Sequence, residues 1–204
     1  MEANRQLTKS ERELPLAGRL LSSLHIDCCL VISRGSPYPD VLAAAVNGQA
    51  YAIEVTEVHA DDHSSHGSKL AAQEKGCMKK EPLAPYALWH GKPEPLQAIA
   101  HRVESKAVKT YRTEPGERRL LLLAANLAET HKMSTFLIPE FVDVKGLNEL
   151  TNVNLLASGF DRAYLQFHLP AGLFEWTRAR GWSVIQEPRM LGDGNPILAM
   201  LRQR

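Results

Sequence analysis

The chain has 204 residues, of which 44% are hydrophobic and 23% are charged. It is therefore long enough for one domain with a sizeable core and too short for two large ones. Its longest wholly apolar run, residues 120–125, is far shorter than the ~20 residues of a membrane-spanning helix, and the polar N-terminus has no signal-peptide core. These features predict a single cytoplasmic domain over residues 1–204 with no membrane partner.

The cysteines argue against a disulfide-rich protein, and the overall charge does not by itself indicate nucleic-acid binding. Cys28, Cys29 and Cys77 do not form a disulfide framework, so we expect buried reduced thiols. The net charge of +1 lacks the strong basic excess of a typical nucleic-acid-binding domain. The distribution is more informative, because residues 40–68 hold five acidic residues and no Lys or Arg, whereas residues 69–119 hold eleven Lys and Arg against six acids. An acidic block beside a basic one suits a site where carboxylates hold a cation near phosphates, although solvated charged faces produce the same pattern.

The N-terminal third of the chain contains the clearest local signals. Leucines at helical spacing predict a helix over residues 11–24. The apolar, β-branched segment 28–33 predicts a buried strand. Residues 40–46 and 49–58 predict a hairpin, because the Asn47-Gly48 dipeptide between them favours a tight type I′ turn.

The remainder of the chain predicts alternating helices and strands. Apolar residues recur at helical spacing over 96–111, and the leucine-rich segment 119–127 is typical of a buried central strand. The other expected elements are a polar loop at 59–68, a short helix at 68–80, an extended connection at 82–95, a helix near 135–144, strands at 162–168, 182–186 and 196–201, and an unassigned segment at 174–181. This order predicts an α/β fold with a mixed β-sheet flanked by helices.

Two carboxylates in the predicted hairpin are candidates for chemistry. Asp40 stands at its entry, and Glu54 lies in the middle of its return strand, on the face opposite the larger apolar side chains. Two close carboxylates repel each other unless a proton or cation joins them, and Mg²⁺ prefers oxygen ligands. A strict two-residue turn would pair Asp40 with Val55 and place it on the other face from Glu54. A bulge, a three-residue loop or an Asp40 outside the strand would bring the two carboxylates together.

The pattern around these residues resembles the PD-(D/E)xK, or restriction-endonuclease-like, nuclease superfamily. It comprises Pro39-Asp40, thirteen intervening residues and Glu54-Val55-Thr56, followed by an amphipathic helix and a hydrophobic strand. The resemblance implies an αβββαβ core over about 11–127, with α/β additions over about 128–204. It also implies that Asp40 and Glu54 bind Mg²⁺ (or Mn²⁺) and that the Val55 carbonyl completes the ligand set.

The chain departs from the family at Thr56, which stands where the family has lysine. A threonine hydroxyl carries no positive charge to stabilise an attacking hydroxide or a phosphate. Divergent members recruit a lysine from the following helix, so the resemblance implies this role for Lys106, or second for Lys109. A glutamate on the first helix often joins the acidic cluster in that family, which makes Glu11 or Glu13 a candidate.

The function implied is metal-dependent hydrolysis of nucleic-acid phosphodiester bonds, with DNA as the expected substrate and a homodimer or larger complex left open. The alternative is a catalytically inactive nuclease-fold module that binds nucleic acid or a protein partner. A small-molecule-binding α/β protein is a third reading, and it predicts an apolar pocket. Each residue also has a structural alternative: Asp40 as a turn residue, Glu54 as a solvated strand residue, and the lysines as an exposed helix face.

Histidines after the hairpin form a weaker candidate site. His59, His63 and His66 could bind Zn²⁺, but their spacing matches no tight ligand pattern. We expect His131 and His168 to be packing or strand-end residues.

Overall fold

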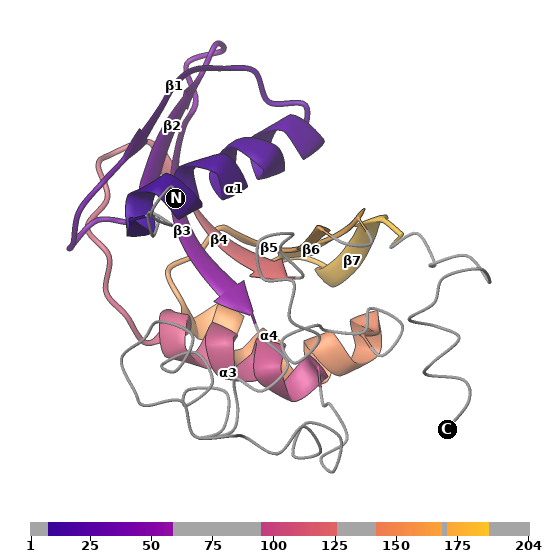
Figure 1. Cartoon of the computed structure of the whole chain (residues 1–204). Coiled ribbons are helices and arrows are strands. Elements are labelled where there is room, and N and C mark those ends of the chain that lie inside the picture. The colour runs from indigo at the N-terminus through magenta and orange to yellow at the C-terminus, as the bar shows by residue number, and fades with distance from the viewer. Residues whose placement is uncertain (1–7, 59–94, 126–141, 169–170, 188–204) are drawn as a thin grey trace, which may run out of the picture.

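The computed structural model describes residues 8–58, 95–125, 142–168 and 171–187 (Figure 1). Within these ranges, one seven-stranded mixed sheet has the strand order β1-β2-β3-β4-β5-β6-β7. Strands β3, β4 and β5 are parallel, and the other neighbours are antiparallel. The elements are α1 (Lys9–Ser23), β1 (Cys28–Ser33), β2 (Val41–Ala45), β3 (Ala50–Val58), α3 (Pro95–Ala107), β4 (Glu117–Ala125), α4 (Val144–Ala157), β5 (Arg162–His168), β6 (Ala171–Thr177) and β7 (Gly181–Gln186). The predicted α/β class and mixed sheet are confirmed.

Helix α1 covers one face of the sheet. It begins with a capping box, in which the Thr8 hydroxyl accepts the Glu11 N–H and the Glu11 carboxylate accepts the Thr8 N–H. Its buried side chains Leu16, Leu20 and Leu21 pack with residues of β2, β3 and β4. This contact fixes the N-terminus of α1 near the start of β2 (Figure 1).

Helices α3 and α4 cover the opposite face (Figure 1). Ile99 and Val103 of α3 and Leu147 of α4 pack against Leu121 of β4 and Leu165 of β5. The parallel arrangement of β3 and β4 requires the chain to cross over between them, and α3 lies in this connection. None of the described helices has the length and apolar character needed to cross a membrane.

Strand β4 is the central strand that its leucine run predicts. Leu121 and Leu123 pack in the α3 layer, whereas Leu120 and Leu122 pack in the α1 layer. Because both faces are covered, the apolar residues do not alternate with polar ones.

We expect Leu122→Ala to lower the free energy of unfolding by about 2–5 kcal/mol, because it leaves a cavity between α1 and the sheet. Urea denaturation followed by circular dichroism measures this loss. Val153→Ala, at an exposed position of α4, is the control and should change stability by less than about 0.5 kcal/mol.

The hairpin between β2 and β3 is present, but its turn differs from the predicted one. Gly48 has a φ of +84° while Asn47 does not have a positive φ, so the turn is not type I′. The Gly48 N–H donates to the Ala45 carbonyl (2.9 Å), and the Ala45 N–H donates to the Gln49 carbonyl (2.9 Å). The loop therefore has three residues, as in hairpins where a glycine with positive φ follows a tight turn.

The extra loop residue decides where Asp40 lies. Val41 pairs with Ile53, so continuing this register places Asp40 opposite Glu54 rather than opposite Val55. Because the side-chain period of a strand is two residues, this shift of one brings the two carboxylates to one side of the hairpin.

Strand β1 is not the buried strand that the sequence predicted. It has the predicted bounds but lies at the edge of the sheet. Leu30, Val31 and Ile32 are exposed. Cys29 is also exposed and Cys28 is half-buried, so the expectation of buried thiols is wrong for Cys29, while Cys77 lies outside the described residues. An apolar segment predicts a strand but does not distinguish an edge from a central position.

Later elements differ from the predictions mainly in their bounds. Helix α3 ends at Ala107 instead of residue 111, and α4 begins at Val144, where the sequence predicted a helix to end. The first half of the unassigned segment 174–181 belongs to strand β6, and its last residue begins strand β7. The expected loop at 59–68, helix at 68–80, connection at 82–94, most of the helix at 135–144 and the strand at 196–201 lie outside the described residues.

His168 links β5 to α1 and is a packing residue, as predicted. Arg19 lies 3.2 Å from the His168 Nδ1 atom, and burial, with the positive charge of Arg19, lowers the pKa of His168 to about 4. In the unfolded chain the pKa would be about 6.5, so the fold favours the neutral ring.

We expect the contribution of His168 to stability to be complete above pH 6.5 and to be lost as the pH falls from 6.5 to 4, by roughly 1–2 kcal/mol for a partly exposed group. Urea denaturation at several pH values measures this loss. The His168→Gln variant should show a flatter profile over the same range, and an unchanged profile would contradict the assignment.

Candidate metal centre

Asp40 lies just before β2, with its carboxylate held against the edge of β3. Its Oδ2 atom accepts the backbone N–H of Val55 (3.0 Å), and its carbonyl accepts the N–H of Arg34 (2.7 Å). The last pair of the β2–β3 ladder is Val41 with Ile53, so the carboxylate satisfies a donor on β3 beyond the end of β2. Asp40 is only 6% exposed, which makes it a buried carboxylate rather than a solvated turn residue.

Glu54 is also buried, at 3% exposure, and its carboxylate contacts a lysine side chain of α3. The Lys106 Nζ atom lies 2.6 Å from Glu54 Oε1, and the Lys106 side chain is only 12% exposed. Burial raises the pKa of Glu54, and the negative charge of Asp40 adds to this effect while Lys106 opposes it. The charged carboxylate therefore depends on a nearby cation.

The Tyr111 side chain also lies next to Glu54. Its hydroxyl is buried beside the Glu54 carboxylate. Burial raises the pKa of Tyr111, and the negative charge of Glu54 raises it further. The hydroxyl thus stays protonated and can donate to an oxygen atom at this site.

Helix α1 brings a third carboxylate and a second lysine towards Asp40. Lys9 Nζ lies 2.6 Å from Asp40 Oδ1 and 3.3 Å from Glu13 Oε1. Burial raises the pKa of Glu13 to about 7, and the charge of Asp40 contributes. Glu11 instead caps the helix through Thr8, so Glu13 is the first-helix glutamate that the structure places in the acidic cluster.

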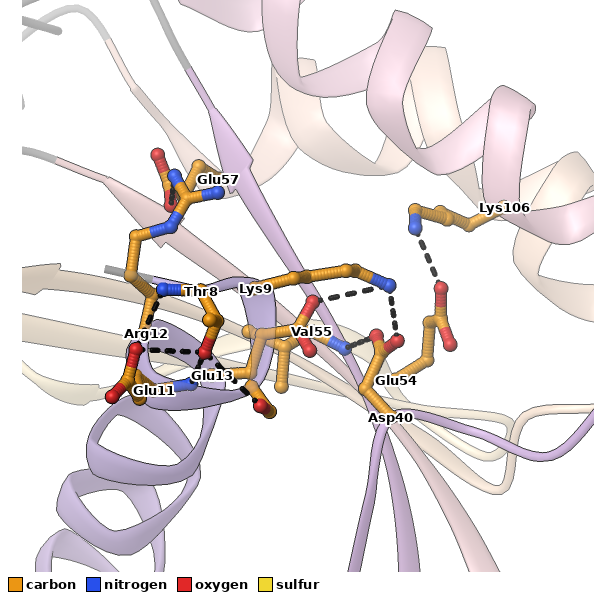
Figure 2. A network of polar contacts seen from close by, with 11 residues as sticks. Thr8, Lys9, Glu11, Arg12, Glu13, Asp40, Glu54, Val55, Glu57 and Lys106 are labelled. Atoms are coloured by element: carbon orange, nitrogen blue, oxygen red, sulfur yellow. Dashed lines mark hydrogen bonds and ion pairs between the residues drawn. The ribbon is translucent and has the colours of Figure 1, made fainter. Parts of the chain in front are cut away.

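Figure 2 shows that Lys9 and Lys106 approach the two carboxylates from opposite sides. Lys9 comes from α1 and contacts Asp40, whereas Lys106 comes from α3 and contacts Glu54. We call Glu13, Asp40, Glu54 and the two lysines the acidic centre.

The remaining candidate residues lie at or beyond the border of the acidic centre. Thr56 is buried on β3, two residues after Glu54 and on the same face. Val55 donates its N–H to Asp40, and the ligand role of its carbonyl stays a prediction. Lys109 lies beyond the end of α3 and is exposed, so it does not share a helix face with Lys106.

The acidic centre has the donor chemistry that suits Mg²⁺. All the side-chain donors are carboxylate oxygens, and two of the three carboxyl groups have a raised pKa because they are buried and lie close to further negative charge. Within the described ranges, no three His, Cys, Asp or Glu side chains stand close enough together to form a complete metal site. Lys9 lies between Asp40 and Glu13, so the Glu13 carboxylate is linked to that of Asp40 through the Lys9 ammonium group. Asp40 and Glu54 are therefore the two candidate ligands for a divalent cation.

Lys9, a member of the acidic centre, and Tyr111, whose hydroxyl lies beside Glu54, were not among the predicted site residues. Lys9 precedes the leucine pattern of α1, and its only local signal is its i,i+4 spacing to Glu13. Tyr111 fits the apolar spacing of the helix predicted over 96–111, which hides the role of its hydroxyl. Both positions depend on how segments far apart in sequence pack on the sheet. His59, His63 and His66 lie outside the described residues.

Comparisons of the chain with protein-family models, with curated proteins and with solved structures find no match.

Proposed function

We propose that this protein is a metal-dependent nuclease that hydrolyses phosphodiester bonds of nucleic acid, with DNA as the substrate. The observation that carries the proposal is the contact between Lys106 and Glu54, with 2.6 Å between Nζ and Oε1. Thr56 leaves the family's lysine position without a positive charge, and Lys106 supplies an ammonium group to the same carboxylate from α3. A buried ion pair adds little stability over apolar residues of the same size, so stability alone gives little reason for Glu54 and Lys106 to occupy these positions together.

The order of the elements supports a restriction-endonuclease-like core. Helix α1, the antiparallel strands β1, β2 and β3, helix α3 and the parallel strand β4 follow the αβββαβ order that the resemblance implies. Strands β5, β6 and β7 extend the sheet beyond that core.

Asp40 and Glu54 would hold Mg²⁺ or Mn²⁺, with the Val55 carbonyl as a further oxygen ligand. When bound, such a cation would activate water and neutralise negative charge on the phosphate. The 3% exposure of Glu54 keeps this chemistry away from bulk water, where charge stabilisation is weaker.

Lys106 would act on the substrate oxygens and on the attacking water. Its ammonium has three donors, one of which is used by Glu54. The other two can hold the attacking water in line with the phosphorus and stabilise the charge that develops on a phosphate oxygen. Water attack forms one P–O bond, the bond to the leaving oxygen breaks, and the proton of the water leaves to solvent or to a nearby carboxylate.

The exposed cations beyond α3 support a polyanionic substrate. Lys109 and Arg112 are exposed, and Lys109 follows Lys106 by three residues, with its N–H donating to the Lys106 carbonyl. Cationic side chains beside an acidic centre can bind flanking phosphates.

The test of the proposed function is cleavage of supercoiled plasmid and of single-stranded DNA by the purified protein in Mg²⁺ or Mn²⁺, with EDTA as the control. We expect metal-dependent cutting that EDTA abolishes. Absence of cutting in either metal, with DNA still retained in a gel shift, would contradict the proposal and favour a nuclease-fold module that only binds nucleic acid.

A further inference from the structure

The two lysines of the acidic centre differ in how firmly the fold holds them. The Lys106 side chain is 12% exposed, whereas that of Lys9 is 67% exposed. Each ammonium nevertheless lies 2.6 Å from a buried carboxylate. Moving Lys106 away from Glu54 would leave charge buried without a partner, while Lys9 can turn into water at little cost.

The Lys9 ammonium also lies between Asp40 and Glu13, at a position where the two carboxylates could otherwise share a metal cation. It lies 2.6 Å from Asp40 and 3.3 Å from Glu13, and in Figure 2 it reaches across to the Asp40 side of the centre. Both carboxylates contact the same ammonium group, and burial, followed by the negative charge of Asp40, raises the pKa of Glu13, so positive charge between the two groups is favourable. The ammonium supplies one unit of charge, and a divalent cation would supply two.

We propose that Lys9 is the exchangeable counter-ion of Asp40, and that a divalent cation displaces its ammonium, which then turns towards solvent and the substrate phosphates, while Lys106 stays on Glu54. This inference rests on the proposed function, because it concerns the same cation at the same carboxylates. Its consequence is that Lys9 lowers the affinity of the protein for the metal. When no metal is bound, Lys9 balances the negative charges of Asp40 and Glu13.

The first test measures Mn²⁺ binding by isothermal titration calorimetry, without nucleic acid, in about 0.15 M salt, where exposed charges are screened. We expect Lys9→Met to bind Mn²⁺ about two- to five-fold more tightly than the wild type, the range that corresponds to losing a competing exposed ion pair. The matched control is Arg12→Met, which removes one positive charge from the same helix. Arg12 contacts Glu57, at 3.2 Å, in place of Asp40, so its loss should change Mn²⁺ affinity less.

The outcomes separate this inference from the proposed function. Tighter binding by Lys9→Met but not by Arg12→Met supports the exchange. Mn²⁺ binding that appears only in Lys9→Met overturns it, because the cation then does not displace the ammonium of the wild-type chain. If the wild type binds Mn²⁺ and both variants bind it with unchanged affinity, or both bind it more tightly to the same extent, the exchange is overturned. The proposed metal centre is then retained. Failure of all three proteins to bind Mn²⁺ overturns both proposals.

A second test uses the wild-type chain, so it does not depend on how a variant folds. The rate of Lys9 acetylation by an amine-reactive ester, followed by mass spectrometry, reports whether the ammonium is held by carboxylates. We expect Mn²⁺ to accelerate acetylation of Lys9 several-fold and to leave that of Lys145, which is exposed on α4, unchanged. Equal rates for Lys9 with and without Mn²⁺, at a concentration that saturates the protein, would overturn the exchange.

Discussion

Replacing Glu54 by Gln should lower the rate of DNA cleavage by about 10³-fold or more, a larger effect than we expect from any substitution outside the two proposed metal ligands. The amide keeps the size of the side chain but removes the negative charge that holds the cation, and a metal supplies several kcal/mol of transition-state stabilisation. Initial rates of plasmid nicking in saturating Mg²⁺ measure the loss.

Glu175→Gln is a matched control for this substitution. Glu175 is likewise a buried glutamate in an ion pair, with its Oε1 atom 2.7 Å from Arg162, but it lies on β6. We expect it to lose stability and to keep the cleavage rate of folded protein. A Glu54→Gln protein that is folded and cuts within a few-fold of the wild-type rate would contradict the role of Glu54.

Replacing Lys106 by Met should lower the cleavage rate by about 10²- to 10³-fold, the usual loss when a donor to the developing charge is removed. Methionine preserves most of the packing of the aliphatic chain and removes the ammonium that contacts Glu54. Single-turnover cleavage at several pH values checks the assignment. The variant should also need higher pH for its residual activity, because loss of Lys106 raises the pKa of Glu54 further.

Lys109→Met provides the comparison for Lys106→Met. Lys109 carries the same charge three residues later but is exposed beyond α3. We expect this variant to weaken DNA binding slightly, with the largest difference from wild type at low salt, and to leave the rate of the bound complex unchanged. Equal losses of single-turnover rate in the two variants would show that Lys106 acts only as a general surface charge.

The sequence predicted the parts of the fold that depend on local pattern. Leucines at 120–123 predict a strand covered on both faces, and β4 is such a strand. The exposed position of β1 was not predictable in this way, because an edge strand and a central strand can have the same apolar composition. What distinguishes them is whether another strand pairs alongside.

The acidic centre was likewise only partly predictable from the sequence. Asp40, Glu54 and Lys106 could be proposed from spacing and resemblance, but their convergence depends on a single residue in the turn. With a two-residue loop Asp40 would lie on the other face of the hairpin, whereas the three-residue loop, with Gly48 at positive φ, places it opposite Glu54. The contact of Lys9 with Asp40 was beyond prediction, because it depends on the angle at which α1 packs against the sheet.

The most direct test of the central claim titrates Mn²⁺ into the protein with DNA present and follows two quantities in the same samples. The bound metal is followed by electron paramagnetic resonance, and the initial cleavage rate is followed on gels. The account predicts that metal binding and cleavage rise together with one midpoint, and that Asp40→Asn weakens the first and abolishes the second. Cleavage that persists in Asp40→Asn, or that proceeds without bound metal, would contradict it.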